Sequence, residues 1–143
     1  MAQEFKYVSG VLPLEYKNVR ILSQAYTIGD SVMLNRDGTA KDVIPATSLT
    51  VTSNIYGIVM STQVSGDTTM LIALVRPDQT WSADVTNTAV ITDNQQRMVL
   101  TNTGTVNNTH NDSTAGIFQQ TGIAPQGITT RIVGKFLVGV SAA

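Results

Sequence analysis

The longest apolar run in the chain reads Thr69-Met70-Leu71-Ile72-Ala73-Leu74-Val75. A short apolar run between turn residues is typical of a strand buried on both faces, although a buried helix has the same pattern. Pro77 follows the run, and residues 80–85 then alternate apolar and polar side chains around Trp81. Alternation with a period of two indicates a half-buried strand. The centre of the chain therefore favours β-structure.

Short apolar segments separated by turn residues extend this pattern in both directions. Asp37-Gly38 follows the apolar residues 31–34, and Asp-Gly between apolar runs predicts a hairpin. No window carries a sustained helical stripe with caps. Short strands at regular intervals predict an all-β fold, a small single-domain sandwich or a barrel-like fold. The remaining expected strands lie at residues 49–52, 56–60, 89–92, 97–100 and 129–138.

Composition agrees with this fold class and limits the partners. The 143 residues suit one domain, 42% of them are hydrophobic, and Thr, which favours strands, is abundant. Only 13% are charged, the net charge is -1, and the basic residues occur singly. Nucleic-acid binding needs clustered basic residues, and a membrane helix needs about 18 apolar residues in a row. We therefore expect neither nucleic acid nor membrane as a partner, and the start of the chain lacks a signal-peptide pattern.

The first 18 residues alternate poorly and contain Gly10 and Pro13. Because proline cannot donate to a strand ladder, we interpret residues 1–18 as an extended N-terminal arm and residues 19–143 as a single β-rich domain. An ordinary edge strand is an equally weighted alternative. The arm's candidate contact residues are apolar or aromatic: Phe5, Tyr7, Val8, Val11, Leu12, Leu14 and Tyr16.

A polar, nearly uncharged segment at residues 101–114 interrupts the strand rhythm, and residues 122–128 form a second irregular stretch. Such loops either carry a contact surface or are plain surface loops. If this loop binds a partner, its candidate residues are Asn107, Asn108, His110, Asn111 and Asp112.

Residues for catalysis or metal binding are sparse. His110 is the only histidine, and there is no cysteine, so multi-histidine, thiolate and disulfide sites are excluded. The acidic residues are scattered, and several lie where turns favour aspartate. No phosphate loop, nucleophile elbow or zinc-protease motif occurs. We expect a protein without catalytic activity, metal or cofactor.

Five segments resemble the head decoration, or capsid cement, proteins of tailed bacteriophages. They are Gly29-Asp30-Ser31-Val32, residues 35–39, Tyr56-Gly57-Ile58-Val59, Ala115-Gly116-Ile117-Phe118 and residues 132–136. The resemblance implies a structural virion protein, made in the host cytoplasm, that binds the major capsid protein on the outside of the shell. It also implies trimers at three-fold or quasi-three-fold positions and an N-terminal arm, residues 2–19 here, that grips the shell.

An alternative function is a binding module of the virion, such as a tail-tube, fibre-base or glycan-binding domain. It would use Trp81 as a stacking platform together with the polar residues 102–113. A core aromatic on a strand is the other interpretation of Trp81. An enzyme is a third possibility, and it would need paired carboxylates that converge only in three dimensions.

Overall fold

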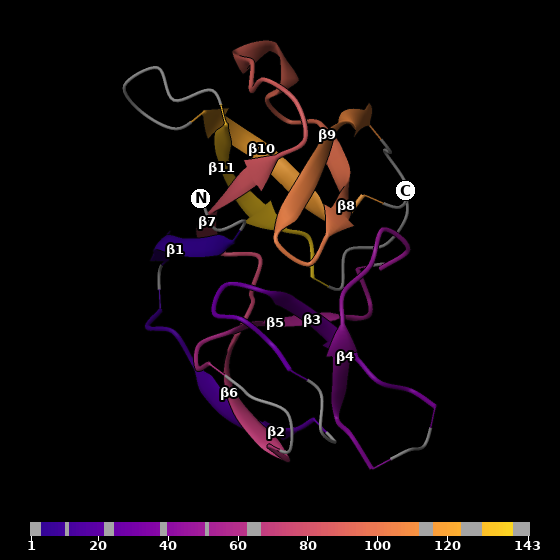
Figure 1. Ribbon diagram of the computed structural model, residues 1–143. Coiled ribbons are helices and arrows are strands. Elements are labelled where there is room, and N and C mark those ends of the chain that lie inside the picture. The colour runs from indigo at the N-terminus through magenta and orange to yellow at the C-terminus, as the bar shows by residue number, and fades with distance from the viewer. Residues whose placement is uncertain are drawn as a thin grey trace.

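The computed structural model describes residues 4–10, 12–21, 25–37, 40–50, 52–62, 67–111, 116–123 and 130–138. Within these ranges the chain is nearly all strand and turn, which confirms the predicted all-β, single-domain class (Figure 1). Their strands are β1 (Phe5–Gly10), β2 (Tyr16–Arg20), β3 (Ser31–Leu34), β4 (Val43–Pro45), β5 (Ile55–Val59), β6 (Thr69–Leu74), β7 (Gln79–Val85), β8 (Arg97–Asn102), β9 (Thr105–Asn111), β10 (Phe118–Ile123) and β11 (Arg131–Phe136), with the 3-10 helix η1 (Ile91–Asp93) between β7 and β8.

The first sheet closes on itself. Its strand order is β1-β7-β11-β10-β8-β9, and β9 also pairs in parallel with the end of β7. Strands β7, β11, β10, β8 and β9 therefore form a five-stranded barrel, because the last strand returns to the first. Strand β1 pairs antiparallel with residues 79–83 of β7, next to the two residues of β7 that pair with β9.

The second sheet has the order β2-β6-β5-β3-β4 and lies below the barrel in Figure 1. Its two terminal strands are linked by Arg20 and Asp42. The Asp42 N–H donates to the Arg20 carbonyl at 2.8 Å, and the Arg20 guanidinium lies 2.7 Å from the Asp42 carboxylate. The hydrogen bond from Arg20 lowers the pKa of Asp42 below its usual value. This link brings the ends of the sheet together around an apolar cluster of Val19, Ile21, Tyr26, Val32, Val43, Val59, Met70 and Ile72.

Strand β6 separates the two hydrophobic clusters of the domain. Met70 and Ile72 face the cluster inside the second sheet, whereas Ala73 and Val75 face the larger cluster shared with the barrel. Residues 69–74 of the apolar run form strand β6, as predicted, and both faces of this strand are covered at Ile72 and Ala73, whereas Thr69 is exposed. A strand between two apolar layers has few solvent-facing positions, so its sequence lacks a clear alternation.

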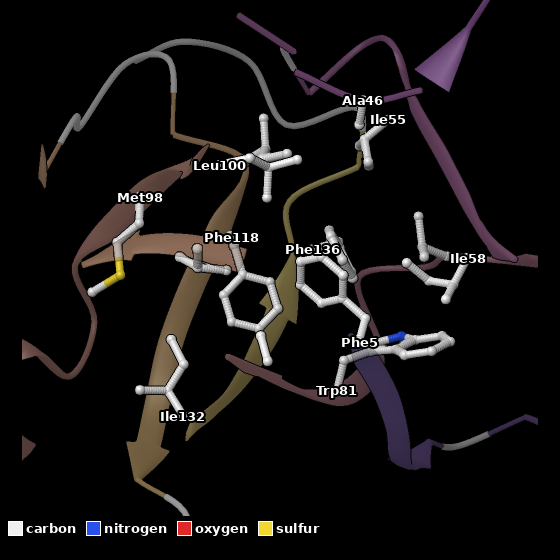
Figure 2. Close-up of a cluster of buried hydrophobic side chains, with 14 of the residues drawn as sticks. Phe5, Ala46, Ile55, Ile58, Trp81, Met98, Leu100, Phe118, Ile132 and Phe136 are labelled. Carbon is white, nitrogen blue, oxygen red and sulfur yellow. The ribbon is translucent and has the colours of Figure 1, made fainter. Parts of the chain in front are cut away.

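Four aromatic rings, those of Phe5, Trp81, Phe118 and Phe136, pack together in the larger cluster (Figure 2). Phe5 lies 4.9 Å from Phe136 and 5.8 Å from Phe118 between ring centroids, and Trp81 meets Phe136 edge-on at 6.2 Å. Tilted and edge-to-face contacts of this kind add to the stabilisation from burial. Because Phe5 comes from β1, the N-terminal strand contributes a ring to the core.

The predicted boundary after residue 18 was wrong. Strand β2 crosses it and pairs with β6 from Tyr16 to Arg20, and β1 pairs with β7. Phe5 is only 2% exposed, so residues 4–18, except residue 11, form part of the domain rather than a separate arm. The edge-strand alternative describes both strands, since each is the terminal strand of its sheet.

A turn at residues 27–31 joins the sheets. Ser31 donates to the carbonyl of Thr103 at 2.7 Å, and the Thr103 hydroxyl donates to Asp30 at 3.1 Å. Thr103 lies at the tip of the β8–β9 hairpin, so this tip is fastened to the start of β3. Burial, reinforced by the charge of Asp30, raises the pKa of the neighbouring Tyr26 from 10.0 to about 12.

Replacing Phe5 by Ala should lower the free energy of unfolding by about 3–5 kcal/mol, because it removes a buried ring and leaves a cavity. Val8→Ala is the matched control on the same strand. Val8 is 51% exposed, so its truncation should change stability by no more than about 0.5 kcal/mol. Urea denaturation measures both, and equal effects would contradict the inclusion of β1 in the core.

Tyr26 should make the free energy of unfolding fall as the pH rises in the alkaline range. A phenol that ionises at a higher pH in the folded protein than in the unfolded chain stabilises the fold fully below pH 10.0, and this contribution disappears as pH rises towards about 12. The unfolding free energy of Tyr26→Phe, measured by denaturant titration, should fall less steeply over this interval than that of the wild type. Tyr16→Phe, at an exposed site, is the control; identical slopes for Tyr26→Phe and wild type would contradict the assignment.

Candidate interaction surface

The N-terminal segment, residues 4–20, is held on its inner side by a charged cluster. Arg131 donates to the Glu4 carbonyl at 3.1 Å and to the Asp84 carboxylate at 2.8 Å. The other Asp84 oxygen accepts the Glu4 N–H at 3.2 Å. The Arg131 and Asp84 side chains are only 17% and 12% exposed, so their pairing is shielded from solvent. This cluster fixes where the segment enters the sheet.

Gly29 allows the segment to pass close to the turn between the sheets. The Phe5 N–H donates to the Gly29 carbonyl at 3.0 Å. Gly29 has φ +94°, and a Cβ built on it would lie 2.3 Å from the Glu4 Cβ. Any side chain at residue 29 would therefore strain the backbone and collide with the N-terminal segment.

Three of the candidate arm residues contact the core instead of facing outward. Phe5 is buried, the Tyr7 ring packs edge-on against Trp81 at 5.5 Å, and Leu14 is partly buried against the larger cluster. The assignment of Phe5 to a contact surface was wrong, since this side chain is buried in the core, whereas Tyr7 and Leu14 are only partly covered by it. The sequence did not separate them from their exposed neighbours because all are apolar or aromatic.

Three other candidates do face outward. Val8, Leu12 and Tyr16 are 51%, 56% and 55% exposed. Val8 lies at a bulge in β1, where the register with β7 shifts between Tyr7 and Ser9. Val11, the remaining candidate, lies outside the described residues. Val8 lies on β1, Tyr16 on β2 and Leu12 on the connection between them. We call these three exposed positions, taken along the chain, the N-terminal apolar strip.

The far end of the segment is fixed as well. The Glu15 carbonyl accepts the Leu74 N–H at 2.9 Å, and its carboxylate lies 2.6 Å from Arg76. Lys17 donates to the Tyr56 hydroxyl at 2.9 Å, a hydrogen bond that raises the pKa of the lysine. The strip is thus displayed between two anchored ends, which reduces the conformational entropy that a partner must remove on binding.

The polar segment predicted as a loop is mainly a hairpin. Strand β8 runs to Asn102, residues 103–104 turn, and β9 covers Thr105–Asn111. Val106 and Asn108 lie on the inward face of β9, and the period of two between them was the signal that sequence analysis missed. His110 and Asn111 belong to β9, whereas Asp112 lies outside the described residues.

Asn108 has a structural role, so its assignment to an exposed binding loop was wrong. Only 8% exposed, it donates to the carbonyls of Asn87 and Thr88 at 2.9 and 3.2 Å, and its Oδ1 accepts the Asn87 N–H at 2.9 Å. Asn107 is half-buried and accepts from Thr109 within β9. Asn108 therefore holds the connection after β7 against the barrel.

A second buried amide secures the same connection. The Gln120 side chain on β10 is fully buried, and its NH₂ group donates to the Val90 carbonyl and to Asn94, both at 2.9 Å. The connection carries η1, whose first residue, Ile91, is 65% exposed. Asn108 on β9 and Gln120 on β10 thus hold the connection between β7 and β8 through their amide groups. Both amides occupy inward positions, where apolar residues are usual.

Trp81 is a core residue, and its interpretation as a sugar-stacking platform was wrong. It is 1% exposed, and its indole N–H donates to Gln79 Oε1 at 3.0 Å. The same oxygen accepts the Arg76 N–H at 2.9 Å, which ties the ring to the turn between β6 and β7. A ring enclosed in this way presents no face to a ligand.

Within the described ranges, no group of three or more histidine, cysteine, aspartate or glutamate side chains could hold a metal ion. The same ranges contain no helix of the length and hydrophobicity that a membrane crossing needs. No protein-family model matches the chain, and no curated protein is significantly similar to it in sequence. The N-terminal apolar strip is the candidate functional site that the geometry supports best.

Truncating Asn108 should lower the free energy of unfolding by about 1–3 kcal/mol, because Asn108→Ala leaves buried carbonyl and N–H groups unpaired. Asn107→Ala on the preceding residue is the control and should cost less than about 0.5 kcal/mol, since its contacts are local and near the surface. Thermal or urea unfolding measures both. Equal losses for the two variants would contradict a special structural role of the amide contacts of Asn108 with residues 87 and 88.

Proposed function

We propose that this protein is a structural component of a tailed bacteriophage virion that binds the outside of the capsid and stabilises the shell. The observation that carries the proposal is the N-terminal apolar strip, exposed on a segment whose two ends are anchored to the domain. The resemblance to head decoration proteins supplies the partner, the major capsid protein. It also suggests a trimer and synthesis in the host cytoplasm.

Backbone groups add to the proposed contact. Strands β1 and β2 are the terminal strands of their sheets over the described residues. An extended segment of a partner can add to such an edge through main-chain hydrogen bonds, while side chains such as Val8 fill small apolar pockets. This mode depends little on charge, which agrees with a chain that carries only 13% charged residues.

Surface area permits several contacts at once. The chain exposes 7148 Å², and a standard interface takes about 800 Å² from each partner. One footprint on the shell and two contacts with neighbouring copies would use roughly a third of this surface. A trimer that binds at three points attaches far more strongly than each contact alone, so modest individual contacts suffice for durable attachment.

The test is binding of the purified protein to shells of the matching phage assembled without it, followed by sedimentation of the shells. Replacing Val8, Leu12 and Tyr16 together by Ser should weaken binding at least tenfold, a loss of about 1.4 kcal/mol. Leu49→Ser is the matched control, because Leu49 is 85% exposed and lies outside the N-terminal segment. Absence of wild-type binding would refute the capsid proposal, and unchanged binding of the triple variant would refute the role of the strip.

A further inference from the structure

Strand β1 is held by parts of the chain that follow it at a distance, and not by its nearest neighbour in sequence. It pairs with β7, places Phe5 against Phe118 and Phe136, and bonds to the turn at Gly29. Only residues 11–15 separate β1 from β2, yet the two strands belong to different sheets and are not paired with each other. Figure 1 shows β1 beside the barrel, away from β2.

All these contacts join β1 to residues that follow the linker in sequence. They can therefore form in the same way whether β1 belongs to the same chain or to another copy. We propose that the protein exchanges β1 between copies, so that β1 of one chain pairs with β7 of a second copy. Exchange of an identical element is a low-cost route to oligomers, because the native contacts are retained. This inference goes beyond the proposed function and stands whether or not the partner is a capsid.

The site on β7 is specific for β1, which identifies a second copy as the occupant. An incoming strand must supply a phenylalanine that reaches Phe136 at 4.9 Å and a tyrosine edge for Trp81. It must also present a backbone carbonyl to Arg131 and a backbone N–H to Asp84, as Glu4 does at 3.1 and 3.2 Å. Residues 4–7, which comprise Glu4 and the start of β1, meet all these requirements.

The linker has the features of a hinge between β1 and the rest of the domain. Leu12 is 56% exposed and Pro13 is exposed, whereas Glu15 is fixed by Leu74 and Arg76. The change of direction that exchange requires therefore falls at residues 12–13. A proline fixes φ and so restricts the ways in which so short a connection can turn back on its own chain, which favours an extended linker that reaches a second copy. Since the contacts of β1 cancel between the two forms, the conformational preference of the linker and the protein concentration decide the balance.

The chain contains no cysteine, so a designed disulfide can report the exchange without ambiguity. Ser9 and Thr80 are directly opposed in the pairing of β1 with β7. The full-length Ser9→Cys/Thr80→Cys variant is unfolded in urea, refolded at increasing protein concentration and oxidised. Non-reducing electrophoresis and mass spectrometry of the digested protein then locate the disulfide. The matched control is Gln119→Cys/Lys135→Cys, an opposed pair on β10 and β11 that does not involve β1.

Exchange predicts disulfides between residue 9 of one chain and residue 80 of another. The linked species should have twice the monomer mass or a higher multiple, in a fraction that rises with protein concentration, while the control pair yields linked monomers. Intramolecular disulfides alone at every concentration would overturn the proposal. Free thiols in the Ser9→Cys/Thr80→Cys variant, alongside an oxidised control, would overturn it too, because both forms require residues 9 and 80 to be opposed.

Discussion

The structure depends on the backbone pairing of β7, whose two edges serve three strands. One edge pairs with β11, and the other is divided between β1 at residues 79–83 and β9 at residues 84–85. The short parallel pairing with β9 closes the barrel, and the pairing with β1 covers the rest of that edge. Trp81 lies at the middle of β7, where its buried ring meets Tyr7 and Phe136. The N-terminal strand β1 thus has two roles at once. Its backbone pairs with the free edge of β7, and its Phe5 and Tyr7 rings help to bury the aromatic cluster.

Much of the fold could be predicted from the sequence, because most strands carry an apolar pattern that is visible locally. Residues 69–74 form a strand that is covered on both faces at Ile72 and Ala73, and the alternation around Trp81 places that ring inside. Strands β9 and β10 were missed for a common physical reason. At Asn108 and Gln120 a buried amide occupies an inward position, so the apolar period is broken where the structure needs a hydrogen-bond donor. The order of the strands in the sheets could not be predicted from local patterns, because it depends on contacts between distant residues such as Glu4 and Arg131, which are 127 residues apart.

The candidate site was only partly predictable. The apolar composition of residues 5–16 pointed to a contact surface, and Val8, Leu12 and Tyr16 are exposed as a contact surface requires. Phe5, Tyr7 and Leu14 have the same chemical character, yet they pack against the core. Within β1 the alternation of a strand places Phe5 and Tyr7 on the inward face and Val8 on the opposite face. Leu12 and Leu14 lie between strands, where this period does not apply. Which face of an edge strand meets the core depends on the strands around it, so the segment's own sequence does not reveal it.

The contact between Arg131 and Glu4 also bears on the order in which the chain folds during synthesis. Glu4 is made 127 residues before Arg131, whose side chain donates to its carbonyl. Contacts of such long sequence separation form slowly, because a large loop must close before they contribute. Strand β1 leaves the ribosome long before β11 does, because synthesis proceeds from the N-terminal side. During that interval Phe5 and the outer edge of β1 are available to chaperones, or to nascent copies on the same messenger RNA.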